Sequence, residues 1–345
     1  MSPFDPNAAS MPGSGIFGLP YTLEEARVAV LPVPFAATTS YGRGAQHGPR
    51  AVIEASRQVD LYDHTYGDIW SSGIALCPDD PEMEQWDIEA TALADKVIAV
   101  GGLVDGDPEL TAALARVNAL SAHLNARVYE RVAALLAVGK RVATLGGDHA
   151  IPFGAIAAHA ERFPGVGILH LDAHADLRPA YEGFTWSHAS IMGNVLDHLP
   201  GVARIVQVGI RDLSSEERSR IVDSGGRVVT FYDADLAARL HEGTPWRVLV
   251  DEIVAALPPE VYLSFDIDGL DPALCPNTGT PVPGGLGWRE VEALLAGVVR
   301  GGRTIVGLDL VEVAPAPNGD PWNANVGARL LYKMIGAMTK SQRGG

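Results

Sequence analysis

Seven short apolar segments, each followed by polar or glycine residues, alternate with segments of helical spacing along most of the chain. The apolar segments are rich in β-branched residues, which predicts a β-strand in each of them. Their ranges are 27–35, 142–147, 165–174, 204–210, 227–233, 261–268 and 303–310. Strands that alternate with helices at this spacing form βα units, and such units build a parallel sheet.

The segments between the strands have the apolar periodicity of helices, at 48–59, 109–138, 152–163, 215–225, 245–257 and 288–299. The strand segments are almost continuously apolar, as expected for strands that are covered on both faces. We therefore predict an α/β protein with three layers, α-β-α, around a central, mostly parallel sheet. Residues 1–26 begin with a stretch rich in proline, glycine and serine and are expected to form an N-terminal arm. Residues 27–345 are expected to form a single catalytic domain.

The balance of charges limits the possible partners. The 345 residues include 26 Lys and Arg against 42 Asp and Glu, which gives a formal net charge of −16. A nucleic-acid partner is not expected, because phosphate backbones bind clustered basic residues. No apolar run approaches the ~20 residues that cross a membrane, so no membrane partner is expected either. With only two cysteines, Cys77 and Cys275, and no basic residue before Arg27, we expect a cytoplasmic protein without a disulfide framework or signal peptide.

Three of the predicted strands end in clusters of aspartate and histidine. Residues 146–149 are Gly-Gly-Asp-His, residues 172–176 are Asp-Ala-His-Ala-Asp, and residues 266–272 are Asp-Ile-Asp-Gly-Leu-Asp-Pro. Alternate residues of an extended backbone point the same way, so the side chains of each cluster are expected to converge. Ligands of such sheets bind beyond the carboxyl ends of the strands. The clusters therefore predict one cavity lined by four carboxylates and two imidazoles.

Four carboxylates in one cavity repel one another unless positive charge neutralises them. Two divalent cations carry the required charge, and a carboxylate-rich set with imidazole suits Mn²⁺ better than thiolate-loving metals. Two metals that share a water molecule lower its pKa enough to give hydroxide near neutral pH. The sequence thus predicts hydrolysis at a pair of Mn²⁺ ions. Ni²⁺ is the alternative, because such sites accept several ions.

The same clusters resemble the metal motifs of the ureohydrolases, the arginase/agmatinase superfamily. The similar segments are GGDHA (146–150), HLDAHADLR (170–178) and SFDIDGLDP with TGTPVPGGL (264–286). Further similar segments are YGRGAQHGPRAVI (41–53), SHAS (187–190) and LVEVAP (310–315). The resemblance spans about residues 27–340 and implies the arginase-like fold.

The resemblance also implies a role for each ligand. It assigns six metal ligands in this sequence: His149, Asp172, His174, Asp176, Asp266 and Asp268. Asp172 and Asp266 are expected to bridge the two ions. His149 and Asp176 would complete one metal site, and His174 and Asp268 the other. A hydroxide that bridges the metals would attack the guanidinium carbon of a small guanidino compound, and the tetrahedral intermediate would collapse to urea and an amine.

Two residues outside the ligand set match functional positions of the family. Glu312 matches the acidic residue that pairs with the guanidinium group, for which a carboxylate is the natural bidentate partner. His188 matches the loop histidine that carries protons to the leaving amine, and an ordinary imidazole pKa of about 6.5 suits that task. We therefore predict catalytic roles for His188, Glu312 and Asp176. Substrate contacts are predicted for Glu312, His188 and Arg178.

Three other polar residues of the motifs are expected to support the site. Asp148 is expected to orient the neighbouring histidine. Asp271, which precedes a proline, is expected to shape a turn or to support a ligand. His170 is not a ligand position of the family and is expected to be structural.

The substrate is less sharply defined than the chemistry. The segment 278–286 resembles agmatinases, so agmatine, hydrolysed to putrescine and urea, is the first hypothesis. Arg178 has two interpretations: it binds a substrate carboxylate, as in formiminoglutamases, or it pairs with a surface acid such as Glu182. The alternatives are guanidinobutyrase, guanidinopropionase, guanidine hydrolase, arginase and formiminoglutamase. Arginase is disfavoured because Arg178 stands where arginases carry an asparagine.

Functions outside the family fit the sequence less well. A two-metal phosphoesterase would need a Gly-Asn-His-Asp element that we do not find, and a one-zinc deacylase would need fewer carboxylates. A catalytically inactive relative would not need all six ligands. Residues 78–110 match no family segment and are expected to form a lid or a subunit contact. By resemblance alone, we expect a homo-oligomer, either a trimer or a hexamer.

Overall fold

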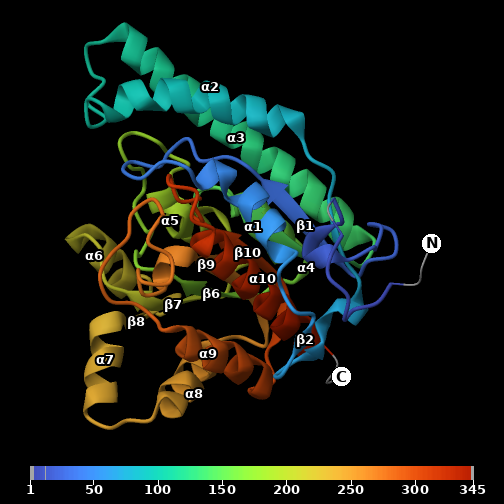
Figure 1. Ribbon diagram of the computed structural model, residues 1–345. Helices are drawn as coiled ribbons and strands as arrows, with labels where there is room; N and C mark the ends of the chain where they lie inside the picture. The colour runs from blue at the N-terminus through green and yellow to red at the C-terminus, as the bar shows by residue number, and fades with distance from the viewer. Residues whose placement is uncertain (1–3, 12, 343–345) are drawn as a thin grey trace.

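A computed structural model describes residues 4–11 and 13–342 of the chain, and Figure 1 shows how its elements are arranged. Eight strands form one sheet in the order β4-β1-β5-β10-β9-β6-β7-β8, and every neighbouring pair is parallel. In this order the strands are Ile74–Leu76, Val28–Val33, Arg141–Gly146, Thr304–Val311, Glu260–Asp266, Gly167–Leu171, Arg204–Ile210 and Val228–Tyr232. A short antiparallel pair, Tyr62–Asp63 (β2) and Gly67–Asp68 (β3), lies apart from this sheet. The predicted α/β class is confirmed, and all seven predicted strands form; the three-residue β4 was missed.

Helices cover both faces of the sheet (Figure 1). One face packs against α1 (Gly48–Ser56), α8 (Trp246–Ala256), α9 (Trp288–Arg300) and α10 (Trp322–Ser341). The other face packs against α3 (Pro108–Ala137), α4 (Phe153–Arg162) and α5 (Ile191–His198). The helices α6 (Ser215–Asp223) and α7 (Asp233–His241) contact the edge strand β8. Both faces of the sheet are therefore dry, which explains why the strands are apolar at nearly every position.

Residues 78–110, which the sequence left without an assignment, contain the additional helix α2 (Pro81–Ile98). It is followed by a loop and by α3, which begins where the Asp107 carboxylate accepts the backbone N–H groups of Glu109 and Leu110. The two helices form a hairpin whose far end extends beyond the sheet (Figure 1). This end has a small hydrophobic core of its own, which includes Val97, Val117 and Phe184.

The N-terminal arm joins the core from Ile16 onward. The 3₁₀ helix η1 (Ile16–Gly18) buries Ile16 and Phe17, and the Phe17 ring lies 4.7 Å from the ring of Tyr332 in α10. The backbone N–H of Phe17 also donates to Ser56 Oγ at 2.8 Å. Part of the expected arm, residues 1–3 and 12, lies outside the described residues, so the division at residue 26 remains a prediction. Among the described residues, no helix has the length and apolarity that a membrane span requires.

Candidate metal centre

Four adjacent strands of the sheet, β5, β10, β9 and β6, end at one place. Because they are parallel, their carboxyl ends lie at the same edge of the sheet. His149 follows β5, Glu312 follows β10, Asp266 ends β9, and Asp172 follows β6. The order of the strands therefore brings together four segments that are far apart in the sequence.

The backbone beyond these strands is extended only in part. Strand β6 ends at Leu171, His174 forms an isolated bridge with Asp212, and Asp176 has a φ of 53°, in the left-handed region. Asp268 lies in the 3₁₀ helix η5 (Ile267–Gly269), which follows β9 directly. The side chains converge, but strand alternation alone does not bring them together. The left-handed conformation at residue 176 and the 3₁₀ helix after β9 also determine where they point.

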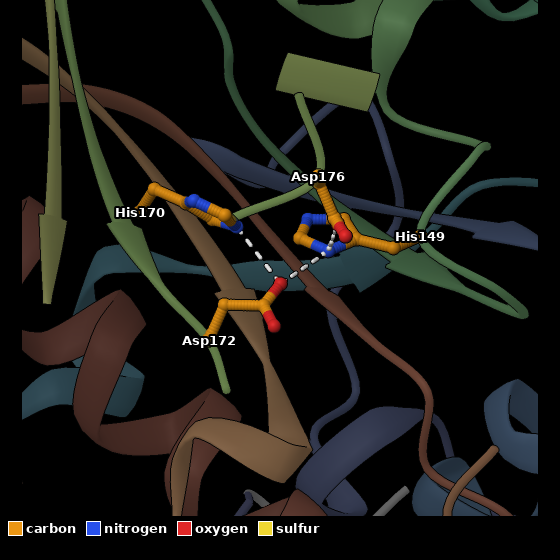
Figure 2. A group of neighbouring side chains, drawn as sticks. All are labelled: His149, His170, Asp172 and Asp176. Atoms are coloured by element: carbon orange, nitrogen blue, oxygen red, sulfur yellow. Dashed lines mark hydrogen bonds and ion pairs between the residues drawn. The ribbon is translucent and has the colours of Figure 1, made fainter. Parts of the chain in front are cut away.

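The first group of side chains surrounds Nδ1 of His149 (Figure 2). This atom lies 2.9 Å from Asp172 Oδ2, 3.1 Å from Asp176 Oδ2 and 3.3 Å from Asp266 Oδ2. His170 approaches the same Asp172 oxygen from the other side, with its Nε2 at 2.8 Å. All five side chains are buried, so their donor atoms form a compact set away from solvent.

The second group lies on the opposite side of the Asp172 carboxylate. Nδ1 of His174 lies 3.4 Å from Asp172 Oδ1 and 3.2 Å from Asp268 Oδ2. Asp172 thus turns one oxygen toward each group, as a bridging ligand would. The structure brings all six predicted ligands into these two adjoining groups, and His170 joins the first of them through Asp172.

Several groups in this cluster have raised pKa values, because they are buried and because the cluster holds an excess of carboxylates. Burial and the neighbouring Asp172 raise the pKa of Asp176 to about 7. Burial, with Asp268 and Asp172 nearby, also raises the pKa of Asp266. Burial disfavours a charged His174, but the carboxylates of Asp268 and Asp172 outweigh it and raise the His174 pKa to about 12. Imidazole and carboxylate donors that hold protons so tightly are a fitting set for two divalent cations, which would take the place of those protons.

Glu312 lies beside the first group and has one oxygen without a partner. Its φ is 63°, its Oε1 accepts the backbone N–H of His149 at 3.0 Å, and its buried Oε2 has no hydrogen-bond partner among the described residues. Gly279 approaches so closely that a Cβ at this position would lie 2.9 Å from Oε2. Burial and the neighbouring Asp148 raise the pKa of Glu312 well above its ordinary value. A buried carboxylate oxygen without a partner is uncommon, and here it provides a place for a cationic N–H donor.

His188 begins the 3₁₀ helix η4 (His188–Ser190) and is buried. Its backbone N–H donates to Thr38 Oγ1 at 3.1 Å, and its Nδ1 lies 3.4 Å from the same oxygen. Burial, together with the neighbouring His174 and His149, lowers the pKa of His188 to about 3. The imidazole is therefore neutral at pH 7. His188 and His174 line the same cavity, so His188 has access to a ligand bound there.

The residue that orients the His149 ring differs from the one expected. Asp148 accepts hydrogen bonds from the N–H and the hydroxyl of Thr38, at 3.1 and 2.8 Å, and so anchors that segment. The Nε2 atom of His149 instead lies 3.0 Å from Ser264 Oγ, and this hydroxyl donates to Asp309 at 3.0 Å. Sequence reasoning missed Ser264, although it lies inside the third motif.

His170 and Asp271 have the supporting contacts that the sequence led us to expect. His170 Nδ1 lies 3.1 Å from Gln207 Nε2, which fixes the ring while its other nitrogen contacts Asp172. Asp271 Oδ1 accepts the backbone N–H of Ala273 at 2.8 Å, as in a local turn.

A cavity of about 320 Å³ opens beside His174, Asp176 and His188, and Arg178 and Asp212 lie in its wall. Nε of Arg178 lies 3.6 Å from Oε2 of the buried Glu217, and its guanidinium stacks 5.0 Å from the Tyr181 ring centre. Arg178 thus faces the cavity and also has an acidic partner. That partner is Glu217 rather than the Glu182 considered from the sequence. The exposed carboxylate of Asp212 makes no hydrogen bond or ion pair with a side chain or backbone group of the described residues.

A sequence model described as the Arginase family matches residues 26–336, so this chain belongs to the arginase family and is a ureohydrolase. The family is one of binuclear metal enzymes, in agreement with the two adjoining groups of His and Asp side chains. The predictions of the family, of the enzyme class and of the arginase-like fold are confirmed.

Among similar curated proteins, the chain is 38% identical to an N(1)-aminopropylagmatine ureohydrolase of Thermus thermophilus. This match covers 91% of the chain and 90% of the relative. It is 31% identical to an agmatinase of Photorhabdus laumondii, over 94% of the chain and 91% of the relative. Among solved structures it is similar to the agmatine ureohydrolase of Thermoplasma volcanium, with a TM-score of 0.71, 27% identity and coverage of 94% and 93%.

Proposed function

We propose that this ureohydrolase releases urea from a guanidino compound with a cationic amine tail, namely agmatine or agmatine extended by an aminopropyl group. The similarity to an N(1)-aminopropylagmatine ureohydrolase suggests the extended substrate, whereas the sequence motifs gave agmatine as the first hypothesis among several. The observation that carries the proposal is the partnerless, buried Oε2 of Glu312 beside the clustered histidines and aspartates. It is an anionic slot for a planar cation next to a candidate binuclear centre.

The proposed metal ligands are the six residues named from the sequence: His149, Asp172, His174, Asp176, Asp266 and Asp268. We propose Mn²⁺ as the metal, with Ni²⁺ as the alternative. When bound, the two ions would supply a water molecule of lowered pKa and an electrostatic sink for the charge that develops on the substrate. Asp172 would serve both ions, because each of its oxygens faces a different group.

Glu312 is proposed to bind and orient the guanidinium group. Its Oε1 is engaged by the His149 N–H, so Oε2 is the atom left for an N–H of the substrate. A charge-assisted hydrogen bond in this buried place is stronger than the same bond in water. The positive charge of a bound guanidinium group would also return the pKa of Glu312 toward its ordinary range.

His188 is proposed to move the proton that hydrolysis requires. The attacking water adds its oxygen to the guanidinium carbon and gives up a proton, and the carbon–nitrogen bond to the amine breaks. A neutral imidazole accepts such a proton and then delivers it to the nitrogen of the leaving amine. Burial lowers the pKa of His188 to about 3, so the ring is unprotonated before the reaction, but it is a weaker proton acceptor than the ordinary imidazole that the sequence analysis assumed.

The wall of the cavity favours an amine tail over a carboxylate tail. Asp212 offers a carboxylate without a partner, whereas the charge of Arg178 is already matched by Glu217. The second candidate is a guanidino acid whose carboxylate competes with Glu217 for Arg178. This candidate is kept because the Arg178 side chain lies in the cavity wall.

A urea-release assay tests the proposal. Protein loaded with Mn²⁺, and separately with Ni²⁺, is given agmatine, N(1)-aminopropylagmatine, arginine, 4-guanidinobutanoate, 3-guanidinopropanoate and guanidine; formiminoglutamate is scored by formamide. We expect kcat/KM to be highest for one of the two amine-tailed compounds. Preference for a guanidino acid would move the assignment to the second candidate, and absence of turnover with every compound would refute both.

The setting of the enzyme is also proposed. We infer a homo-oligomer, a trimer or a hexamer, from the family resemblance, and sedimentation velocity would measure its mass. A reducing compartment such as the cytoplasm suits Cys77 and Cys275, which are both free and buried.

A further inference from the structure

The α2–α3 hairpin contacts, from outside, two loops that line the cavity. One is the segment 34–44, which includes Thr38, the contact of His188. The other is the segment 178–188, which ends at His188 itself. The hairpin lies across one side of the molecule (Figure 1), and it is the region for which the sequence offered only a lid or a subunit contact.

The first loop is held from helix α2. The buried Asp87 accepts the backbone N–H of Ala36 at 2.7 Å. Arg43 donates to the carbonyl oxygen of Ala36 at 3.2 Å and is ion-paired with Asp95 of the same helix. The chain reaches Thr38 two residues after Ala36, so these contacts fix the start of the segment that meets His188.

The second loop is held from helix α3 and also from helix α5, whose Asn194 donates to the carbonyl oxygen of Thr185 at 2.8 Å. The side chain of Asn118 accepts the N–H of Thr185 at 2.9 Å and donates to the carbonyl oxygen of Gly183 at 3.1 Å. Between these two residues, Phe184 is 1% exposed and fills the small core that α2 and α3 share. His188 follows Thr185 by three residues. One amide side chain therefore fixes two peptide groups of the loop just before the proposed catalytic histidine.

The turn in this loop contains one unfavourable backbone conformation. Tyr181 and Phe184 exchange backbone hydrogen bonds at 3.1 and 2.9 Å, and between them Glu182 has a φ of 51° and Gly183 a φ of 84°, which only a glycine adopts freely. A non-glycine residue in the left-handed region persists only when its surroundings over-determine the conformation. Gly102 of the hairpin contributes as well, since a Cβ at this glycine would lie 2.6 Å from the Glu182 Cα.

We propose that Asn118 is a positioning residue: it holds the 183–185 backbone so that His188 stays against Thr38 and faces the cavity. The inference rests on the proposed function of His188 in proton transfer. Helix α3 is suited to this task, because Leu124, Val128 and Val132 anchor it in the main core. The hairpin thus positions a loop residue, His188, by contacts from a rigid helix.

Hydrogen–deuterium exchange tests the positioning without any assay of activity. Asn118→Ala is compared with wild type and with Arg116→Ala as a matched control. Arg116 lies on the same helix and is ion-paired with Glu89 of α2, so the control loosens the hairpin without touching the loop. We expect faster exchange in peptides that cover 178–190 in Asn118→Ala only. Equal exchange in this segment for wild type and Asn118→Ala would overturn the proposal, even in a protein that released no urea.

Kinetics test whether the positioning acts through His188. In metal-loaded enzyme, we expect Asn118→Ala to lower kcat about tenfold and to change KM less than about twofold. In a His188→Ala background the same substitution should have little further effect, as expected for coupled residues. If Asn118→Ala lowers kcat equally in the wild-type and His188→Ala backgrounds, Asn118 does not act through His188 and has only a structural role. Metal content and melting temperature are measured for each variant, and an unchanged metal content separates a displaced loop from a lost centre.

Discussion

The cluster of Glu312 and the six proposed ligands, called the floor below, and the loops around the cavity, called the mouth, are built in different ways. The floor follows four adjacent strands, so its geometry is fixed by the order of a parallel sheet; all of its side chains except His174 are buried, and only His174 and Asp176 reach the wall of the cavity. The mouth includes Tyr41, Arg178, Tyr181 and Asp212, which lie on loops. Residues on a sheet edge are constrained by the whole core, whereas loop residues are free to vary. The comparison leads us to expect that substitutions in the floor change the reaction and that substitutions in the mouth change the choice of substrate.

The largest expected effect lies at the centre of the floor. Asp172→Asn removes the carboxylate that faces both groups of ligands, so both ions should be lost together. We expect kcat/KM to fall by more than about 1,000-fold, since loss of a supporting residue alone costs up to ~100-fold. Metal content by mass spectrometry and urea release measure the two losses. Asp271→Asn, in a turn of the same sheet edge, is the control and should keep both; full metal content in Asp172→Asn would contradict the ligand assignment.

Glu312→Gln should separate substrate binding from metal binding. The amide keeps an oxygen for the His149 N–H but loses the charge that would face the guanidinium group. Truncating one partner of a buried, hydrogen-bonded charge pair costs about 2–5 kcal/mol, roughly 30- to 5,000-fold in kcat/KM. Steady-state kinetics on protein of verified metal content check this. Wild-type kinetics in the variant would show that Glu312 does not contact the substrate.

A decrease in pH from 8 to 6 should weaken metal binding in the floor without lowering the stability of the fold. Because the pKa of His174 is raised to about 12 in the metal-free chain, a cation must displace its proton throughout the neutral range. For each proton that metal binding displaces, the affinity falls about tenfold for every unit by which the pH is lowered. The Mn²⁺ affinity should therefore fall at least ~100-fold from pH 8 to pH 6. Titration calorimetry in buffers of different ionisation enthalpy measures both affinity and proton release. No proton release at pH 7 would contradict this prediction.

The stability of the metal-free protein provides the matching control for pH. The folded pKa of His174 lies above the unfolded value, so its stabilising contribution is complete below about pH 6.5 and decreases as the pH rises toward 12. The pKa of Asp176, raised to about 7, has the same direction of effect, because the buried carboxyl is favoured while protonated. We therefore expect that the titration of these two groups does not lower the melting temperature as the pH falls from 8 to 6. Scanning calorimetry of the protein in chelator measures this.

The smallest expected effect lies at the mouth. Asp212→Asn should raise KM for agmatine by about fivefold, because an exposed ion pair contributes up to ~1 kcal/mol. Butylguanidine, which lacks the terminal amine, should have the same KM in variant and wild type. If the substitution changes KM equally for both compounds, Asp212 does not contact the terminal amine, and the distinction between floor and mouth fails at this residue.

The floor could be predicted from the sequence largely because its proposed ligands end apolar strands or lie within a few residues of their ends. The three clusters stand where apolar runs stop, so each was assigned to a strand end before the order of the strands was known. That order, which inserts β10 between β5 and β9 and so brings Glu312 beside His149, depends on long-range pairing. Local patterns carry no information about such pairing. The resemblance supplied Glu312, whereas periodicity alone would not have done so.

Other features had local signals that were missed, or had none. Asp80 followed by Pro81 is a typical helix start, and it does begin α2. The positive φ of Asp176 could not be predicted, because aspartate is enriched in this conformation among non-glycine residues yet adopts it only in a minority of cases. Asn118 contacts Gly183 and Thr185, which are 65 and 67 residues away in the sequence. The contact depends on a hairpin whose first helix, α2, was not predicted.

The left-handed backbone at Asp176 and Glu312 has a consequence for how this enzyme can evolve in the laboratory. Glycine would relieve about 1–2 kcal/mol of strain at each position, because it has no Cβ to clash with the following carbonyl. That gain would be offset at both positions by the larger conformational entropy of glycine in the unfolded chain, and at position 312 by the loss of the acceptor of the buried His149 N–H. Either substitution would also discard a carboxylate of the candidate site, so the strained backbone is kept at the two residues whose side chains the proposed function requires.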